Sequence, residues 1–199
     1  MKKLETIIHT ETVNYNDNID ELAEVHVATE EIFNGKILHV IRDDVRIPNG
    51  EMASREVIRH IGAVCIIPLT DENEVIVERQ FRYPVNEIIT EIPAGKLDYK
   101  DEDRLEAAKR ELREETGYTA TEWIDLGIFY PAAAYSDEKI TLYLARGLSK
   151  GERELDADEF IDVYKVPMEA LIKDVMDGKI TDNKTQMAVL KAAEYLRRK

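Results

Sequence analysis

The 199-residue chain lacks most of what marks a secreted or membrane-bound protein. It has a single cysteine, so it can form neither an internal disulfide nor a zinc cluster of thiolates, and we expect a reducing, cytoplasmic setting. No apolar run approaches the roughly 18 residues that cross a bilayer, and the first residues show no signal-peptide pattern. We therefore expect no membrane partner.

Basic residues are also scarce, with 27 Lys and Arg against 41 Asp and Glu and a formal net charge of −14. Binding to a nucleic-acid backbone requires clustered Lys and Arg, so we expect no nucleic-acid partner. Only 6 Pro and 9 Gly are present, while 44% of the residues are hydrophobic. This composition predicts a globular chain with a real core.

The pattern along the chain predicts an α+β fold with a mixed sheet. A hairpin signal at Pro48-Asn49-Gly50 between β-branched runs makes residues 1–57 a small β-rich N-terminal segment, followed by a domain over 58–199. Cys65 lies in an apolar strand and is interpreted as a buried structural residue. Strand composition occurs at 62–69, 74–81, 87–92, 123–130, 139–145 and 160–166, and helical spacing at 104–116, 167–177 and 182–198.

The first predicted helix has clear start and stop signals. Asp103 followed by Glu106 forms a capping-box pattern that begins the helix near Arg104, and Gly117 stands where a helix commonly ends. Residues three and four apart share a helix face, so Glu111 and its two acidic neighbours one turn on converge on one side. These three are Glu111, Glu114 and Glu115, while Leu105, Ala108 and Leu112 line another side.

The convergence of Glu111, Glu114 and Glu115 is electrostatically unfavourable in two ways. Like charges at i and i+4 repel by a few tenths of a kcal/mol, and the last turn of a helix favours cations. A hard divalent cation, Mg²⁺ or Mn²⁺, among the oxygens explains such a cluster. The alternative is that neighbouring Lys and Arg residues neutralise the acids in surface pairs worth under about 1 kcal/mol.

The segment Gly95–Tyr118, GKLDYKDEDRLEAAKRELREETGY, resembles the Nudix box. Six residues separate Gly95 from Glu102, one more than the family has, so either the loop carries an insertion or Asp101 takes part. The family role of this first Glu is mainly to brace the loop and the helix. The matching positions are Glu102, Arg110, Glu111, Leu112, Glu114, Glu115 and Gly117.

The resemblance implies an α/β/α sandwich that hydrolyses a nucleoside diphosphate linked to another group, with divalent cations. Clustered metals neutralise charge that develops on phosphoryl oxygens and lower the pKa of a bound water, which suits pyrophosphate cleavage. Arg110 would orient the carboxylates. The implied metal ligands are Glu111, Glu114, Glu115 and the backbone carbonyl of Ala94.

The flanking sequences REVIRHIGAVCIIPL, VERQFRYPV, EIPAGKLD and DEFIDVYKVP are similar to the ADP-ribose and nucleoside diphosphate sugar pyrophosphatase branch of the family. Members of this branch are typically homodimers whose N-terminal β segment crosses to the partner and helps to form the substrate site. The resemblance makes Arg55 and Arg82 candidate contacts to substrate phosphates or ribose, and Glu91 a candidate polar contact. For each arginine, a surface ion pair is the alternative.

The resemblance also implies a catalytic base on an acidic loop after the box. Glu159 is the first choice, with Asp158 and Asp156 behind it, because a carboxylate within hydrogen-bond reach can accept a proton from the attacking water. A loop that closes over substrate would bring it there. The alternative is a merely solvated loop.

One departure from the branch affects the expected substrate. Its members usually carry a Ser-Pro-Gly turn after the box, whereas this chain has Ala132-Ala133-Ala134 in that region. The leading expectation is hydrolysis of ADP-ribose to AMP and ribose 5-phosphate, or of a related nucleoside diphosphate sugar. A Nudix-fold nucleotide sensor that binds its ligand without turnover is the alternative.

Overall fold

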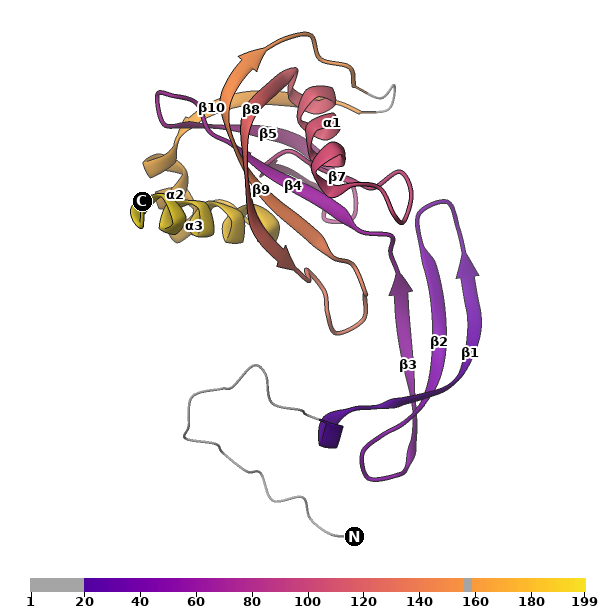
Figure 1. Cartoon of the computed structure of the whole chain (residues 1–199). Coiled ribbons are helices and arrows are strands. Elements are labelled where there is room, and N and C mark those ends of the chain that lie inside the picture. The colour runs from indigo at the N-terminus through magenta and orange to yellow at the C-terminus, as the bar shows by residue number, and fades with distance from the viewer. Residues whose placement is uncertain (1–19, 156–158) are drawn as a thin grey trace.

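The computed structural model describes residues 20–155 and 159–199. Its centre is a mixed four-stranded sheet that lies between one helix on one face and two helices on the other (Figure 1). The two central strands, β4 and β9, run parallel and the outer pairs are antiparallel. This arrangement confirms the predicted α/β/α sandwich with a mixed sheet. In spatial order the strands are β7 (Ala94–Lys96), β4 (Ala63–Pro68), β9 (Ile140–Lys150) and β8 (Tyr118–Phe129).

A second, three-stranded antiparallel sheet adjoins the first. Strand β5 (Glu74–Arg82) lies in its middle, between β10 (Ile161–Pro167) and β6 (Glu87–Glu91). The register places Glu78 directly opposite Glu91. Two acidic residues that are far from the carboxylate helix in sequence are thereby set side by side.

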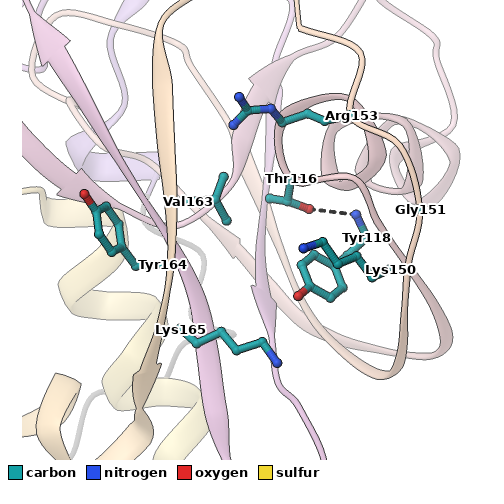
Figure 2. A pocket seen from close by; sticks show the side chains of 8 residues that line it. All are labelled: Thr116, Tyr118, Lys150, Gly151, Arg153, Val163, Tyr164 and Lys165. Atoms are coloured by element: carbon teal, nitrogen blue, oxygen red, sulfur yellow. Dashed lines mark hydrogen bonds between the residues drawn. The ribbon is translucent and has the colours of Figure 1, made fainter.

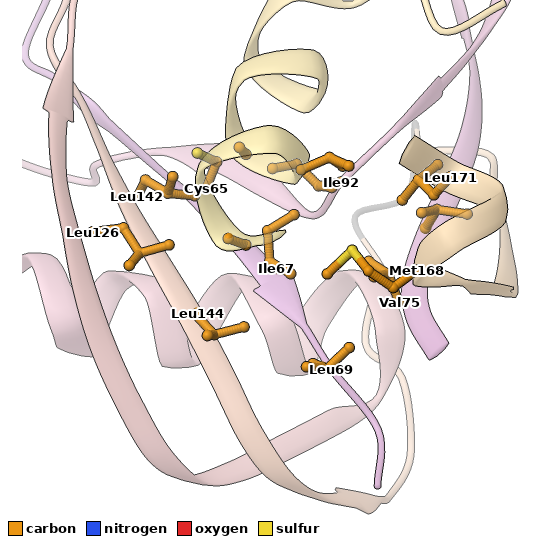
Figure 3. Packing of buried hydrophobic residues seen from close by; sticks show 14 of the residues in the cluster. Cys65, Ile67, Leu69, Val75, Ile92, Leu126, Leu142, Leu144, Met168 and Leu171 are labelled. Atoms are coloured by element: carbon orange, nitrogen blue, oxygen red, sulfur yellow. The ribbon is translucent and has the colours of Figure 1, made fainter. Parts of the chain in front are cut away.

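Strand β4 is buried along its whole length because helices cover both of its faces. Val64 and Ile66 point toward helix α1 (Arg104–Thr116), where they pack against the helix's apolar face. Cys65 and Ile67 alternate to the other face, under α2 (Met168–Met176) and α3 (Asn183–Arg197), as Figure 3 shows. Burial raises the pKa of the Cys65 thiol to about 12, which agrees with a structural cysteine.

Helix α1 begins and ends where the sequence predicts. The Asp103 carboxylate accepts hydrogen bonds from the backbone N–H groups of Leu105 (2.9 Å) and Glu106 (3.0 Å), and Gly117 ends the helix with φ at 75°. The predicted capping box is only half formed, because the Glu106 side chain pairs instead with Lys109 at 2.7 Å. The helix start is therefore stabilised by Asp103 alone.

A third sheet, formed by the N-terminal segment, lies to one side of the sandwich (Figure 1). It follows a 3-10 turn (Asp20–Leu22) and consists of antiparallel strands β1 (Val25–Asn34), β2 (His39–Arg46) and β3 (Met52–Arg59), with the predicted turn between the last two. All ten residues of β1 are exposed. Strand β3 continues to Arg59, two residues past the predicted segment boundary.

Two strands and part of a third lie outside the sequence prediction. β7 is three residues long, too short for a periodic signal, and β1 has no alternation of buried and exposed positions. β8 begins at Tyr118, five residues before the predicted strand, in a stretch whose residues are mostly polar. In the part of the chain that the structure describes, no helix is long and apolar enough to span a membrane.

Candidate functional site

The carboxylate face of α1 forms one wall of a cavity of about 220 Å³. The opposite wall is the short segment of β7 that begins at Ala94, and the loop after β9 contributes Glu159. The structure thus brings together the four predicted metal ligands, the orienting arginine and the predicted base. The lining residues are Ala94, Gly95, Lys96, Asp98, Arg110, Glu111, Glu114, Glu115, Glu154 and Glu159.

Two close contacts hold the helix against β7. A Cβ atom built at Gly95 would lie only 2.0 Å from the carboxyl carbon of Glu111, so a glycine is required there for that carboxylate to approach. The Glu115 carboxylate accepts a hydrogen bond from the backbone N–H of Ala94 at 2.9 Å. Backbone and carboxylates therefore meet at the point where the Ala94 carbonyl was predicted to act.

Arg110 lies between the acidic groups. Its Nη1 donates to Glu111 at 2.7 Å and to Glu114 at 3.2 Å, and its Nε lies 3.4 Å from Asp98. These contacts agree with the predicted role of orienting the carboxylates. That role itself stays a prediction.

The loop before the helix is braced by Glu102 despite its additional residue. The Glu102 carboxylate accepts a hydrogen bond from the backbone N–H of Asp98 at 2.7 Å and lies 3.4 Å from Arg110. Although Glu102 stands one position later than the first Glu of the family motif, its side chain still reaches across the loop to Asp98. Among the described contacts, Asp101 makes no comparable one.

Burial strongly perturbs the acidic groups of the helix. Glu111 and Glu115 are 8% and 7% exposed. Burial raises the pKa of Glu111 to about 7, although Arg110 opposes the shift, and burial together with the charge of Glu78 raises the pKa of Glu115 well above its usual range. A divalent cation that entered among these buried carboxylates would offset the cost of their negative charge.

Within residues 20–155 and 159–199, no three acidic, His or Cys side chains are arranged so that they could hold a metal ion without rearrangement. The cavity is nevertheless lined by oxygen donors of the kind that hard divalent cations take. The oxygen donors are present but not grouped around one point, because the Glu111 carboxylate is hydrogen-bonded to Arg110 and the Glu115 carboxylate to the Ala94 N–H. To bind a cation, Glu111 and Glu115 would have to exchange these hydrogen bonds for contacts to the metal.

Glu78 is a buried acidic residue that the sequence prediction missed. It is 4% exposed, and burial followed by the charge of Glu91 raises its pKa to about 8. The available signal was a carboxylate closing the apolar run Val75-Ile76-Val77 in a strand. A charged residue in that position needs a partner or a function.

Arg82 and Glu91 lie together, as a bidentate ion pair at 2.6 and 2.9 Å. Lys184 at the start of α3 also contacts Glu91, and Asp182 contacts Lys184 at 3.0 Å. Burial acts to raise the pKa of Glu91, but these cations lower it overall. Arg82 remains 43% exposed in its side chain, so it can still reach a ligand.

The remaining predicted residues lie elsewhere or outside the described chain. Arg55 is on β3 in the N-terminal sheet and pairs with Glu24, away from the cavity residues of the same chain. The alternative bases Asp156 and Asp158 lie outside the described residues. Ala132 begins a hydrogen-bonded turn, its carbonyl accepting from the backbone N–H of Ser136 at 3.0 Å.

A larger hollow, of about 340 Å³, lies beyond the C-terminal end of α1 (Figure 2). Its lining includes Lys150, Lys165 and two tyrosines but no acidic residue. Arg153 on its rim donates to the backbone carbonyl of Ile161 at 2.9 Å. Without carboxylates this hollow cannot be the predicted cation site, so the smaller acidic cavity is the candidate.

Comparisons with known proteins agree with this geometry. The NUDIX domain family model matches residues 59–187. The chain is 42% identical over 170 residues to an ADP-ribose pyrophosphatase of Bacillus subtilis, covering 84% of this chain and 91% of the relative. It is also 42% identical over 180 residues to a methanol dehydrogenase activator of Bacillus methanolicus, covering 88% and 97%. A crystal structure of an ADP compounds hydrolase shares the fold with a TM-score of 0.78 and 24% identity, covering 87% of this chain and 94% of the other.

The buried carboxylates predict an unusual pH dependence of stability in the metal-free protein. Burial raises the pKa values of Glu78 and Glu111 to about 8 and about 7, against 4.5 for a freely solvated Glu, so the folded state holds protons that the unfolded state has released. The free energy of unfolding should therefore fall, by on the order of 5 kcal/mol, between pH 5 and 8. Glu91, whose pKa is lowered, contributes stability that is already present across this window.

Urea unfolding in chelator at pH 5, 6.5 and 8 measures this loss. Glu115→Gln removes one of the buried charges, and its stability should vary less with pH. A free energy of unfolding that rises from pH 5 to pH 8 would show that the folded state does not keep these carboxyl groups protonated.

Proposed function

The chain belongs to the Nudix family, and from this premise we propose that it hydrolyses the pyrophosphate bond of ADP-ribose, or of a related nucleoside diphosphate sugar. For ADP-ribose the products are AMP and ribose 5-phosphate. The observation that carries the proposal is the cavity in which Glu111, Glu114 and Glu115 face the Ala94-Gly95 backbone. The relative named ADP-ribose pyrophosphatase supports the choice of substrate.

We propose Mg²⁺ or Mn²⁺ as the cation. The donor set fits, since it consists of three carboxylates and a backbone carbonyl, and Gly95 leaves room for Glu111 to approach. The residues that would hold the metal are Ala94, Glu111, Glu114 and Glu115. When bound, it supplies neutralisation of phosphoryl charge and a lowered pKa of the attacking water.

The chain's own side chains would perform the remaining steps. Glu159, on the cavity wall, accepts the proton of the water that attacks phosphorus. Arg82 binds the substrate's phosphate with its exposed face, while Glu91, itself held by Lys184, fixes the position of the Arg82 guanidinium. Arg110 keeps Glu111 and Glu114 aligned until the cation replaces it as their partner.

We also propose that the active form is a homodimer joined through the N-terminal sheet. In Figure 1 none of the described helices lies over the three-stranded N-terminal sheet, and β1 exposes all ten of its residues. Large apolar side chains are exposed along this segment. Crossing to the partner would carry Arg55 toward the partner's cavity. The exposed apolar residues are Leu22, Val25, Val27, Ile32, Phe33, Ile37, Leu38 and Met52.

A second candidate function is control of a partner enzyme, and the relative named methanol dehydrogenase activator favours it. In its strict form, the chain binds a nucleotide without turnover. The complete set of box carboxylates counts against that form, because a pure binder has no need of a cluster whose burial is costly. We place either function in the cytoplasm, which a single buried thiol supports.

The substrate proposal is tested by assaying ADP-ribose, sugar nucleotides, dinucleotide cofactors and diadenosine polyphosphates with Mg²⁺ and with chelator. We expect ADP-ribose or a sugar nucleotide to turn over only with metal, and Glu115→Gln to lower kcat by at least about 100-fold, since a lost electrostatic contact of this kind is worth some 3 kcal/mol. Glu106→Gln, on the exposed face of the same helix, is the matched control. Turnover of no compound favours the sensor, and undiminished turnover by Glu115→Gln overturns the metal assignment.

Glu159→Gln should lower kcat by about 100-fold, the usual scale of general-base catalysis, with little change in Mn²⁺ affinity. Glu152→Gln, earlier in the same acidic segment and not on the cavity wall, serves as the control. The measurement is kcat as a function of pH, whose acidic limb should disappear in the variant. Wild-type kcat in Glu159→Gln would remove this residue from the mechanism.

Light scattering at micromolar concentration tests the dimer. We expect twice the mass of one chain, and we expect Val27→Asp combined with Phe33→Asp to give a monomer with reduced kcat/KM, since burying two unpaired charges in the interface is costly. Glu122→Lys on the exposed part of β8 is the control for added surface charge. A fully active monomeric wild type would contradict both the assembly and the role of Arg55 across it.

A further inference from the structure

Glu78 has no hydrogen-bond partner for its Oε1 atom among the described residues, although it is 4% exposed. An unpaired carboxylate in a protein interior costs several kcal/mol unless a charge or a proton compensates it. It lies at the end of the fully buried part of β5, after Val75, Ile76 and Val77. The position is therefore one that an apolar side chain would occupy at lower cost.

The strands beside Glu78 do not provide the missing partner. Across β5 and β6 it faces Glu91, a like charge, and across β5 and β10 it faces Val163. The two nearby cations, Arg82 and Lys184, both bond to Glu91. Among the described residues, Glu78 is thus left with a negative neighbour and no ion pair of its own.

Glu78 lies near Glu115, because it is paired across the strands with Glu91, three residues before Ala94, and the Ala94 backbone N–H bonds to the Glu115 carboxylate. In agreement, the charge of Glu78 is, after burial, the largest influence that raises the pKa of Glu115, and Glu159 acts on both of them. Glu115 comes from the helix and Glu78 from the second sheet, so the two carboxylates approach from different layers. Glu115 lines the cavity in which the box residues converge.

We propose that Glu78 is an additional ligand of the divalent-cation site, shared with Glu115, which this chain supplies from strand β5 outside the Nudix box. The inference rests on the proposed function for the existence of the site and deepens it by extending the ligand set. With Glu78 included, the cation is held by carboxylates from both the helix and the second sheet. The orphaned Oε1 then acquires the partner that the metal-free protein does not give it.

Mn²⁺ binding to the full-length protein tests the proposal without substrate. Titration calorimetry at pH 8 on the wild type, Glu78→Gln and Glu74→Gln compares the buried carboxylate with one on the same strand that faces Lys165. We expect Glu78→Gln to weaken Mn²⁺ binding at least tenfold or to remove one bound equivalent, and Glu74→Gln to bind as the wild type does. An unchanged isotherm in Glu78→Gln overturns the proposal and leaves Glu78 as a protonated structural residue.

Thermal unfolding gives a second readout. At pH 8, where the Glu78 carboxyl is partly ionised, Glu78→Gln should raise the Tm of the metal-free protein, because a buried like charge is removed, and should reduce the further rise that Mn²⁺ produces. If Glu78→Gln does not fold, Glu78→Asp keeps the charge but shortens its reach, and its Mn²⁺ affinity should be lower than wild type. Wild-type affinity in Glu78→Asp counts against the proposal.

The outcome is separable from the proposed function. A wild type that binds Mn²⁺ through Glu78 but hydrolyses no compound of the panel would overturn the substrate and keep the ligand. Hydrolysis of a compound of the panel, with Mn²⁺ binding unaltered in Glu78→Gln, would keep the proposed function and overturn Glu78 as a ligand. A wild type that binds no Mn²⁺ overturns both.

Discussion

The structure depends on one electrostatic constraint, the burial of like-charged carboxylates at the C-terminal end of α1. Glu111 and Glu115 repel each other, oppose the helix dipole and lose hydration. The surrounding residues offset part of this cost, through the Arg110 guanidinium and the Ala94 N–H. A fold stabilised only by packing would not need such a cluster, whereas a hydrolase that must bind a cation next to an anionic substrate does.

The packing of the sandwich layers holds these buried carboxylates in position. The apolar face of α1 packs on Val64 and Ile66 and fixes the rotation of the helix, so that its carboxylates face β7. Gly95 then sets how closely backbone and carboxylate approach. The second sheet adds Arg82 and Glu91 at the same end of the domain, where a phosphate could be recognised. A strongly acidic site can accept an anionic substrate if a bound cation reverses the sign of the local electric field.

The sequence predicts the helix and the grouping of its carboxylates well, because helical spacing determines which residues share a face. The bounds of α1, its cap and the grouping of Glu111, Glu114 and Glu115 all follow from residues close in the chain. Pairing across sheets does not follow in this way, since register between β5 and β6 is set by tertiary packing. Glu78 was missed, and the Arg82–Glu91 pair unforeseen, for that reason. The half-formed capping box shows the same limit, as Glu106 found a partner one turn along the helix.

The proposed cation site is tested most directly by the position of a bound cation in crystals of the wild-type protein soaked with Mn²⁺. The anomalous signal of manganese locates the ion without reference to activity. We expect a peak between the Ala94 carbonyl, Glu111, Glu114 and Glu115, with Arg110 displaced from Glu111. Crystals with no peak in the cavity, and with the Arg110–Glu111 hydrogen bond intact at saturating Mn²⁺, would contradict it.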